Sequence, residues 1–177
     1  AYVSDVDGDA LTITAVTSPT NGTATCDASS TDCTYTPNQN FNGTDSFTYK
    51  VNDGVLDSNI STVSITVNAQ NDAPTVSTGT ISTNEDTAAT LDLSTLATDV
   101  DGDDLTFNNT PPANGSVTID GSILTYTPKA NWNGTESFMF TASDGTVTSG
   151  QTQIVVTVAA VNDAPIANAV SASTNED

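Results

Sequence analysis

The chain has 177 residues, with 22 acidic side chains, two lysines and no histidine, for a formal net charge of −20. This composition excludes a nucleic-acid binder, which needs many Lys and Arg side chains, and it excludes catalytic or zinc sites built on histidine. No apolar stretch approaches the length of about 18 residues that a membrane-spanning helix requires. Cations, neutral surfaces such as sugars, or a second copy of the chain with metal between them suit this charge.

Two cysteines mark the first predicted hairpin. Cys26 and Cys33 flank the turn-forming run 27–32, and the segments 23–25 and 34–36 look like the two arms of the hairpin. A cross-strand disulfide fits this spacing if the cysteines face each other. Such a bond would indicate an oxidising compartment. The alternative is a pair of free, partly buried thiols.

An internal repeat organises the chain. Four segments recur with an offset of 91 residues: 34–37 at 125–128, 40–47 at 131–138, 71–74 at 162–165, and 84–86 at 175–177. The Asp-Val-Asp-Gly-Asp run at 5–9 recurs at 99–103. We therefore expect a first repeat at 1–72 that lacks its first strands, a complete repeat at 73–163, and the opening strand of a third at 164–177.

The first repeat lacks a counterpart of Thr75–Ser94, which would leave part of its core exposed. Either the chain is an excerpt of a longer array, or the tail 164–177 donates a strand to a neighbouring molecule. The excerpt is the interpretation that we favour.

Alternation of apolar and polar residues predicts the strands of the complete repeat. The segments are Val76–Ser82, Ala89–Leu93, Leu105–Asn108, Ser116–Asp120, Ile123–Thr127, Glu136–Ala142 and Gln151–Val158. Seven short strands in about 90 residues, separated by dense turn signals, indicate an antiparallel β-sandwich. The fold class is therefore all-β, with tandem sandwiches joined end to end.

The acidic residues gather at turns and at the junctions between repeats. Three carboxylates lie within five residues at Asp5, Asp7 and Asp9, and again at Asp99, Asp101 and Asp103. Ca²⁺ takes six to eight oxygen ligands with flexible geometry, which suits such a site better than Mg²⁺ does. The spacing does not fit an EF-hand, since glycine stands at the fourth position rather than the sixth. A solvated turn is the alternative, but the recurrence of the run favours calcium.

The order of these motifs resembles bacterial cadherin-like or immunoglobulin-like tandem repeats of very large adhesins of the RTX and VCBS type. Asn84-Glu-Asp86, 97–103, Ala142-Ser-Asp-Gly145 and 156–165 follow the order of the glutamate motif, Asp-x-Asp loop, Ala-x-Asp-x-Gly turn and Asn-Asp-x-Ala-Pro linker of cadherins. The resemblance implies a seven-stranded Greek-key sandwich and calcium at the joints between repeats.

Carried over residue by residue, the resemblance implies four groups of metal ligands. They are Asn71, Asp72, Asp99, Asp101, Asp103 and Asp144 at the central joint, Glu85, Asp86, Asn162 and Asp163 at the next, Asp5, Asp7, Asp9 and Asp53 at the joint above residue 1, and Glu176 at a joint beyond the chain.

Two functions follow from this interpretation. The first is that of calcium-stiffened extender repeats of a bacterial cell-surface or secreted adhesin, active in cell adhesion or biofilm, whose partners are neighbouring repeats or homotypic contacts. The alternative is binding of a polysaccharide, which needs exposed aromatic rings. The candidates are Trp132, Phe41, Tyr2, Tyr35 and Tyr126, and most of them fit core positions better. We expect no enzymatic activity, because the acidic clusters resemble metal cages and have no pocket-forming sequence around them.

Overall fold

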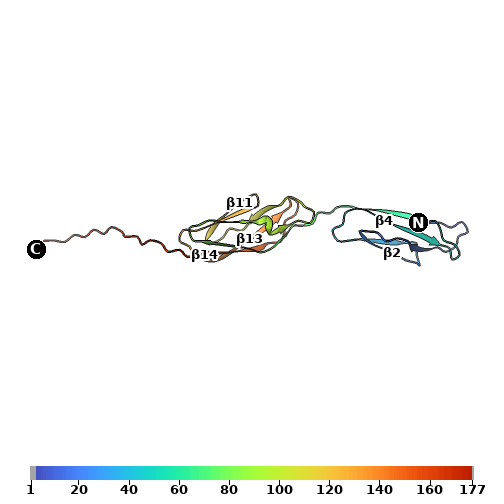
Figure 1. Cartoon of the computed structure of the whole chain (residues 1–177), viewed down its shortest axis with the longest axis horizontal. Helices are drawn as coiled ribbons and strands as arrows, with labels where there is room; N and C mark the ends of the chain where they lie inside the picture. The colour runs from blue at the N-terminus through green and yellow to red at the C-terminus, as the bar shows by residue number, and fades with distance from the viewer. Residues whose placement is uncertain (1–2, 177) are drawn as a thin grey trace. The chain divides into compact units, whose positions relative to one another are not determined.

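The computed structural model describes residues 3–176. The chain divides into two compact units, Ala1–Asn71 (unit 1) and Asp72–Asp177 (unit 2). Strands dominate both units, and the described residues contain one short 3₁₀ helix and no α-helix (Figure 1). The all-β class predicted from the sequence is confirmed. The arrangement of the repeats end to end stays a prediction.

Unit 2 is a sandwich of two sheets with a small third pair of strands. One sheet has the order β10-β13-β14-β7 and the other β11-β12-β8, while β6 pairs with β9. The elements are β6 (Thr75–Val76), β7 (Gly79–Asn84), β8 (Ala89–Asp92), η1 (Leu93–Thr95), β9 (Ala97–Thr98), β10 (Thr106–Asn109), β11 (Gly115–Asp120), β12 (Ile123–Pro128), β13 (Gly134–Ser143) and β14 (Thr152–Ala159).

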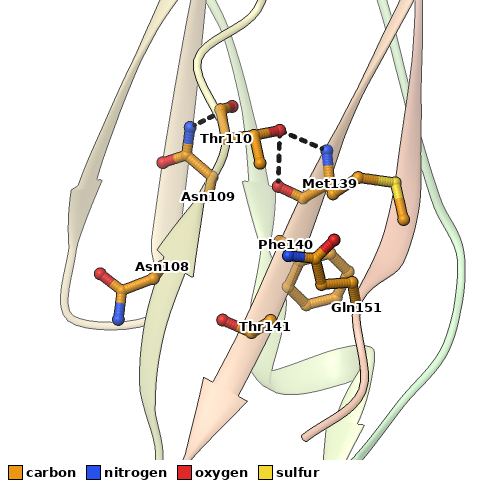
Figure 2. A pocket seen from close by; sticks show the side chains of 7 residues that line it. All are labelled: Asn108, Asn109, Thr110, Met139, Phe140, Thr141 and Gln151. Atoms are coloured by element: carbon orange, nitrogen blue, oxygen red, sulfur yellow. Dashed lines mark hydrogen bonds between the residues drawn. The ribbon is translucent and has the colours of Figure 1, made fainter. Parts of the chain in front are cut away.

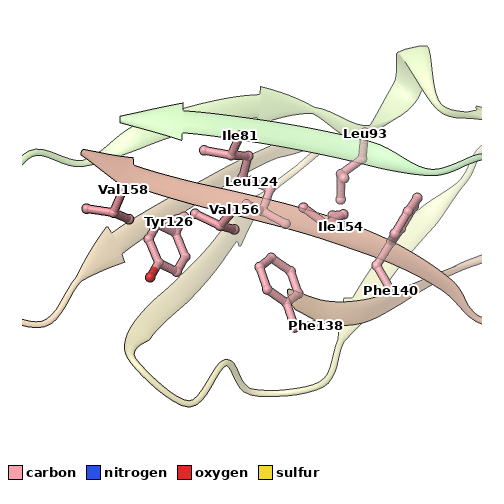
Figure 3. Packing of buried hydrophobic residues seen from close by; sticks show 9 residues of the cluster. All are labelled: Ile81, Leu93, Leu124, Tyr126, Phe138, Phe140, Ile154, Val156 and Val158. Carbon is pink, nitrogen blue, oxygen red and sulfur yellow. The ribbon is translucent and has the colours of Figure 1, made fainter. Parts of the chain in front are cut away.

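The core of unit 2 lies between its two larger sheets. Tyr126, Leu124 and Ile154 are fully buried, and the inward-facing residues alternate with exposed ones along each strand, as the sequence pattern predicts. The buried cluster consists of Ile81, Leu93, Leu124, Tyr126, Phe138, Phe140, Ile154, Val156 and Val158 (Figure 3). Burial of such side chains is the main source of the free energy that stabilises the unit.

The strands differ from the predicted set at the start of unit 2. The segment Val76–Ser82, predicted as one strand, forms two strands in different sheets, because the chain leaves its pairing with β9 at Val76 and joins β14 from Gly79 onward. The pairing of β7 with β14 is parallel, whereas a wholly antiparallel sandwich was expected. A period-2 pattern shows which side chains face inward but does not identify the neighbouring strand.

Unit 1 has the same arrangement with fewer strands. The sheet β1-β4-β5 faces the hairpin β2-β3, from β1 (Thr12–Ala15), β2 (Gly22–Cys26), β3 (Cys33–Pro37), β4 (Gly43–Asn52) and β5 (Ser61–Val67). Counterparts of β6 to β9 are missing from the described part of unit 1. Cys26 and Cys33 lie directly opposite each other and form a disulfide.

A glycine packed against a tyrosine recurs in both units. A Cβ atom at Gly115 would lie 2.5 Å from the Tyr126 ring, and one at Gly22 would lie 2.6 Å from the Tyr35 ring, so only glycine fits at either position. The Tyr126 hydroxyl donates a hydrogen bond to Glu136 Oε1 (2.5 Å), and the Tyr35 hydroxyl donates to Asp45 Oδ2 (3.1 Å). Burial and the neighbouring Glu136 carboxylate raise the pKa of Tyr126. The same polar contact therefore fixes the end of the hairpin in each unit.

Candidate metal centre

The loop between β9 and β10 is folded around the Asp99 side chain. Asp99 Oδ1 accepts hydrogen bonds from the backbone N–H groups of Asp101 (2.8 Å), Gly102 (3.0 Å) and Asp103 (3.4 Å). Gly102 has φ +82°, a left-handed conformation that favours glycine. The Asp-Val-Asp-Gly-Asp sequence thus forms a tight loop in which one carboxylate binds the backbone of the next two aspartates.

This loop brings three carboxylates together. One oxygen from each of Asp99, Asp101 and Asp103 lies within 4.8 Å of the other two, and Asp101 and Asp103 are exposed to solvent while Asp99 is half-buried. Asp101 Oδ2 also accepts a hydrogen bond from the backbone N–H of Asp72 (2.8 Å), the first residue of unit 2. The loop therefore contacts the linker motif that the sequence places beside it.

The second oxygen of Asp99 has no hydrogen-bond partner. Asp99 Oδ2 is buried from solvent, and it is the one such side-chain atom among the residues that the structure describes. A buried carboxylate oxygen without a donor is costly, and such atoms usually have a partner. A cation in the cluster would supply that partner, so the donor set fits a hard divalent ion with oxygen ligands.

Asp144 lies in a turn of its own. Asp144 Oδ1 accepts hydrogen bonds from the N–H groups of Thr146 and Val147, both at 2.6 Å. Asp53 makes the same contacts in unit 1, with Val55 and Leu56, both at 2.7 Å. These hydrogen bonds hold the pKa of Asp53 below its usual value. The structure does not group Asp144 with the three clustered carboxylates, and its role as a ligand stays a prediction.

The first acidic loop repeats the turn around Asp99. Asp5 Oδ1 accepts hydrogen bonds from the N–H groups of Asp7 (2.8 Å) and Asp9 (3.2 Å), and Gly8 has φ +81°. Within residues 3–176, however, the three closely grouped carboxylates occur only in the second loop. Both loops thus have the same backbone turn, but the three carboxylates lie close together only in the loop of Asp99.

The motif at the opposite end of unit 2 is organised by Glu85. Its side chain is 6% exposed, its Oε1 accepts a hydrogen bond from the Val161 N–H (2.5 Å), and its Oε2 accepts one from Asn133 Nδ2 (3.4 Å). The next residue, Asp86, accepts a hydrogen bond from the Asn131 N–H through Oδ1 (3.0 Å). The glutamate motif therefore binds the chain where it leaves β14, just before the second Asn-Asp-Ala-Pro motif.

The remaining predicted ligands lie in exposed segments. Asn162 and Asp163 follow Val161 directly and are exposed, and Asn162 Nδ2 donates a hydrogen bond to the Asp163 carbonyl (3.2 Å). Glu176 is exposed in the segment 160–176, which forms no strand, and Asn71 is exposed at the end of unit 1. Their roles as ligands stay predictions.

Two acidic residues that the sequence analysis did not select have defined structural roles. Glu136 Oε2 accepts hydrogen bonds from the backbone N–H groups of Ala113 and Asn114 (2.9 and 2.8 Å). The Asp45 carboxylate accepts hydrogen bonds from the backbone N–H groups of Thr20 and Asn21 (3.1 and 2.8 Å). Burial raises the pKa of Asp45, but the backbone hydrogen bonds outweigh it and hold that pKa below its usual value. Glu136 is in phase with Phe138 along β13, and this signal could have identified it as an inward-facing acid.

A hollow of about 140 Å³ lies on unit 2 over β10 and β13 (Figure 2). Its lining combines the side chains of Asn108, Asn109, Thr110, Thr141 and Gln151 with the apolar side chains of Met139 and Phe140. The one aromatic ring that lines it, Phe140, is 1% exposed and belongs to the core. This hollow therefore lacks the exposed ring on which a sugar could stack.

The aromatic residues proposed as a sugar platform have other contacts. Tyr126 is buried, Tyr35 is half-buried beside Asp45, and Trp132 packs against the core of unit 2. Phe41 is half-buried, and Tyr2 lies outside the described residues. The structure thus favours a packing role for Tyr35, Tyr126 and Trp132.

Known proteins place this chain in a family. The model of the bacterial Ig domain matches residues 1–66 and 71–157. The chain belongs to the bacterial Ig domain family. No curated protein matches its sequence. The described residues contain no helix long and apolar enough to cross a membrane.

Solved structures of cadherins share the fold of this bacterial Ig chain. Human protocadherin-24 EC1-2 is similar with a TM-score of 0.58 and 16% identity over 91% of this chain and 85% of the other. Mouse cadherin-23 EC22-24 is similar with a TM-score of 0.53 and 17% identity, over 85% of this chain and 53% of the other. The predicted resemblance to cadherin-like and immunoglobulin-like repeats is confirmed. The adhesin type stays a prediction.

A third similarity is to a much longer chain. An endo-fucoidan hydrolase from glycoside hydrolase family 107, MfFcnA4, is 30% identical over 88% of this chain, with a TM-score of 0.41. The similar region spans 24%, about a quarter, of the hydrolase chain.

Proposed function

We propose that this chain is a pair of calcium-binding extender repeats from a bacterial cell-surface or secreted adhesin, with a mechanical and non-catalytic role. The observation that supports calcium is the convergence of the Asp99, Asp101 and Asp103 carboxylates within 4.8 Å. Two unit charges at that separation repel by about 1 kcal/mol in bulk water and by roughly 3–4 kcal/mol near a protein surface. A divalent cation would replace this repulsion by attraction.

The ligand chemistry supports calcium over magnesium. The cluster offers carboxylate oxygens on a short loop whose remaining positions are open to solvent, since Asp101 and Asp103 are exposed. Ca²⁺ accepts irregular sets of carboxylate, carbonyl and water oxygens, whereas Mg²⁺ demands a near-ideal octahedron. The buried oxygen of Asp99 would complete such a set.

A bound ion would also restrain the start of unit 2. Asp101 already accepts a hydrogen bond from the Asp72 N–H, so the loop and the linker motif share a contact. An ion held by Asp101 would strengthen that connection and would reduce the freedom of the segment that joins the two units. Rigid spacing between repeats is the mechanical property that an extender needs.

Surface or secreted localisation is consistent with the Cys26–Cys33 disulfide, because such bonds persist in oxidising compartments. Calcium sites of extracellular modules bind on the order of 10⁻⁴ to 10⁻³ M. A site in that range fills outside a cell and empties inside it.

Calorimetric titration of the full chain with CaCl₂ tests this proposal. We expect saturable binding in or near the submillimolar range and a rise in the unfolding temperature of unit 2 as the site fills. The substitution Asp103→Asn should weaken the binding step of this loop by about tenfold or more, because it removes one charged ligand. Small-angle scattering should show a narrower distribution of shapes in calcium than in EDTA.

Asp104→Asn is the matched control. Asp104 is exposed and adjacent in sequence but lies outside the cluster, and its substitution removes the same charge. It should leave the affinity within about twofold, since surface charges contribute little. Equal weakening in both variants would indicate general charge attraction, and no heat of binding at millimolar calcium would refute the proposal.

A further inference from the structure

The chain enters and leaves the larger sheet of unit 2 on two neighbouring strands. β7 is the first strand of this sheet along the chain, and β14 is the last. The two strands pair in parallel, from Gly79 opposite Ile154 to Asn84 opposite Ala159. Figure 3 shows them side by side with their arrows in the same direction. The incoming chain therefore reaches one end of the pair, and the outgoing chain leaves from the other end.

This arrangement decides how tension acts on unit 2. When the chain is pulled from both sides of the unit, the forces at Gly79 and Ala159 point in opposite directions along the two strands. The hydrogen bonds of the ladder run between the strands. They therefore share the load, and they must break together before the strands can slide. In an antiparallel pair both forces would act at the same end, and the hydrogen bonds would break one at a time.

Glu85 extends the connection beyond the ends of both strands. Its N–H donates a hydrogen bond to the Ala159 carbonyl (2.9 Å), and its Oε1 accepts one from the Val161 N–H (2.5 Å). Its Oε2 accepts a hydrogen bond from Asn133 Nδ2 (3.4 Å), and the side chain is buried. Hydrogen bonds to a carboxylate are stronger than those between neutral groups. Glu85 thus joins the end of β7 to the outgoing chain, where tension leaves the unit.

Apolar side chains cover the other end of the ladder. A Cβ atom at Gly79 would lie 2.7 Å from Leu96 Cδ1, 3.1 Å from Leu91 Cδ2 and 3.4 Å from Ile154 Cγ1, so these side chains lie close to the Gly79 backbone. Ile81, the next inward-facing residue of β7, is buried as well. Water can replace a broken hydrogen bond easily only where it has access to the backbone. The inner side of the ladder is therefore protected from such replacement.

We propose that the parallel pair of β7 and β14 is the load-bearing element of unit 2, and that Glu85 raises its resistance to tension without any bound ion. The inference deepens the mechanical role proposed above and rests on it, because an extender transmits force from one repeat to the next. It gives Glu85 a role that depends on protein donors alone, whereas the sequence analysis selected this residue as a metal ligand.

Single-molecule force measurements on the full chain in EDTA, with two attachment geometries, test the load-bearing pair. Handles at the two ends of the chain pull β7 and β14 in opposite directions, and unfolding of the stretch 79–159 should lengthen the chain by about 25 nm. In the second geometry the C-terminal handle is moved to the thiol of Gly150→Cys, just before β14, so that both strands are pulled from the same end. At equal force, unit 2 should unfold faster in the second geometry by about tenfold or more, because its hydrogen bonds break in sequence.

The Gly150→Cys handle does not disturb the pair that it tests. Gly150 is exposed, and a Cβ atom there would have no atom within 4 Å. The two native cysteines are bonded to each other, so the new thiol alone reacts with the handle. Equal unfolding rates in the two geometries would overturn the proposal.

Glu85→Gln tests the contribution of the carboxylate. The amide keeps the size of the side chain but loses its charge, so the rate of unfolding between the chain ends should rise by about fivefold or more. Glu136→Gln is the matched control, because Glu136 also accepts two backbone N–H groups but joins neither of them to β7 or β14. It should change this rate by less than about twofold. Both substitutions should lower the thermal unfolding temperature, so only the force measurement separates their roles.

Equal effects of the two substitutions on the rate under force would refute the role of Glu85. If Glu85→Gln does not fold, the comparison of the two geometries still decides the matter, because it uses the native Glu85. EDTA removes calcium from all of these measurements. A negative result therefore leaves calcium binding by the Asp99 loop intact, and a failure of calcium binding leaves the load-bearing pair intact.

Discussion

The two units share one design, and the described part of unit 1 contains fewer of its strands. They share the hairpin closed by a tyrosine and a glycine, the Asp-Val-Asp-Gly-Asp loop, and the turn that contains Asp53 or Asp144. Unit 2 adds β6 to β9 and fully buries β14, while unit 1 leaves β5 half-buried. The comparison shows that the loops take their shape from local hydrogen bonds, whereas burial of the core needs strands that are distant in sequence.

The two units also differ in how the hairpin is held. Leu124 and Ile119 lie opposite each other in unit 2, and Leu124 packs against β8 residues in a three-stranded sheet. Unit 1 has Cys33 and Cys26 at these positions, and among its described residues no third strand pairs with this hairpin. A covalent bond thus stands where unit 2 uses apolar packing.

Truncation of matched strand residues should have the largest effect. Ile154→Ala should lower the free energy of unfolding of unit 2 by about 2–5 kcal/mol, because it opens a cavity in a fully buried core. Val63→Ala, at the counterpart position, should cost clearly less, since Val63 is only half-buried. Fluorescence of Trp132, the single tryptophan, reports unfolding of unit 2 alone. Equal losses would show that Val63 contributes as much to the stability of unit 1 as Ile154 does to that of unit 2.

Removal of the disulfide should have the next largest effect. Chain-entropy arguments for a loop of this size give roughly 2–3 kcal/mol, and the loss should fall on unit 1 only. Differential scanning calorimetry of the Cys26→Ala, Cys33→Ala double variant should show one transition moved to lower temperature. The transition reported by Trp132 should stay in place, and its movement would contradict the independence of the units.

A fall in pH should produce the smallest difference in stability between the two units. In unit 1, burial opposes ionisation of Asp45, but its backbone hydrogen bonds lower its pKa below the usual 3.8, and hydrogen bonds also lower the pKa values of Asp27, Asp53 and Asp57. Carboxylates of this kind contribute stability above the unfolded-state pKa and lose it as the pH falls through the folded-state pKa. Unit 1 should therefore lose stability below about pH 4.

Asp45→Asn provides the test of that sign. The amide keeps an acceptor for the Asn21 N–H but cannot titrate, so the stability of unit 1 should become less dependent on pH between about 4 and 2. Unfolding by urea at several pH values measures it. If the free energy of unfolding of the variant depends on pH as steeply as that of the original chain, Asp45 does not cause the acid sensitivity of unit 1.

The sequence predicted most of the regular pattern. The repeat offset identified matching residues in the two units, and the predicted strands Ile123–Thr127 and Glu136–Ala142 lie within β12 and β13. Alternation succeeds there because each strand has one buried face. The prediction failed at Val76–Ser82, where the chain passes from one sheet to another. The alternation of inward- and outward-facing side chains does not indicate which strand pairs with the segment.

The sequence identified the acidic residues of the candidate site, but it did not show which of the more distant ones lie close together. Asp99, Asp101 and Asp103 converge because Asp99 Oδ1 accepts hydrogen bonds from the backbone N–H groups of Asp101, Gly102 and Asp103, which is local information. The contact of Glu85 with Val161 joins residues 76 positions apart and depends on the parallel pairing of β7 with β14. No local sequence pattern indicates that β7 pairs with β14. The polar motif around Glu85 therefore could not predict that Glu85 is buried.

The turn around Asp99 depends on atoms within five consecutive residues, and the turn around Asp5 has the same form in a unit with a different core. Such a loop is a self-contained module. An added repeat with this five-residue sequence would therefore carry within itself the information for the backbone turn of its acidic loop.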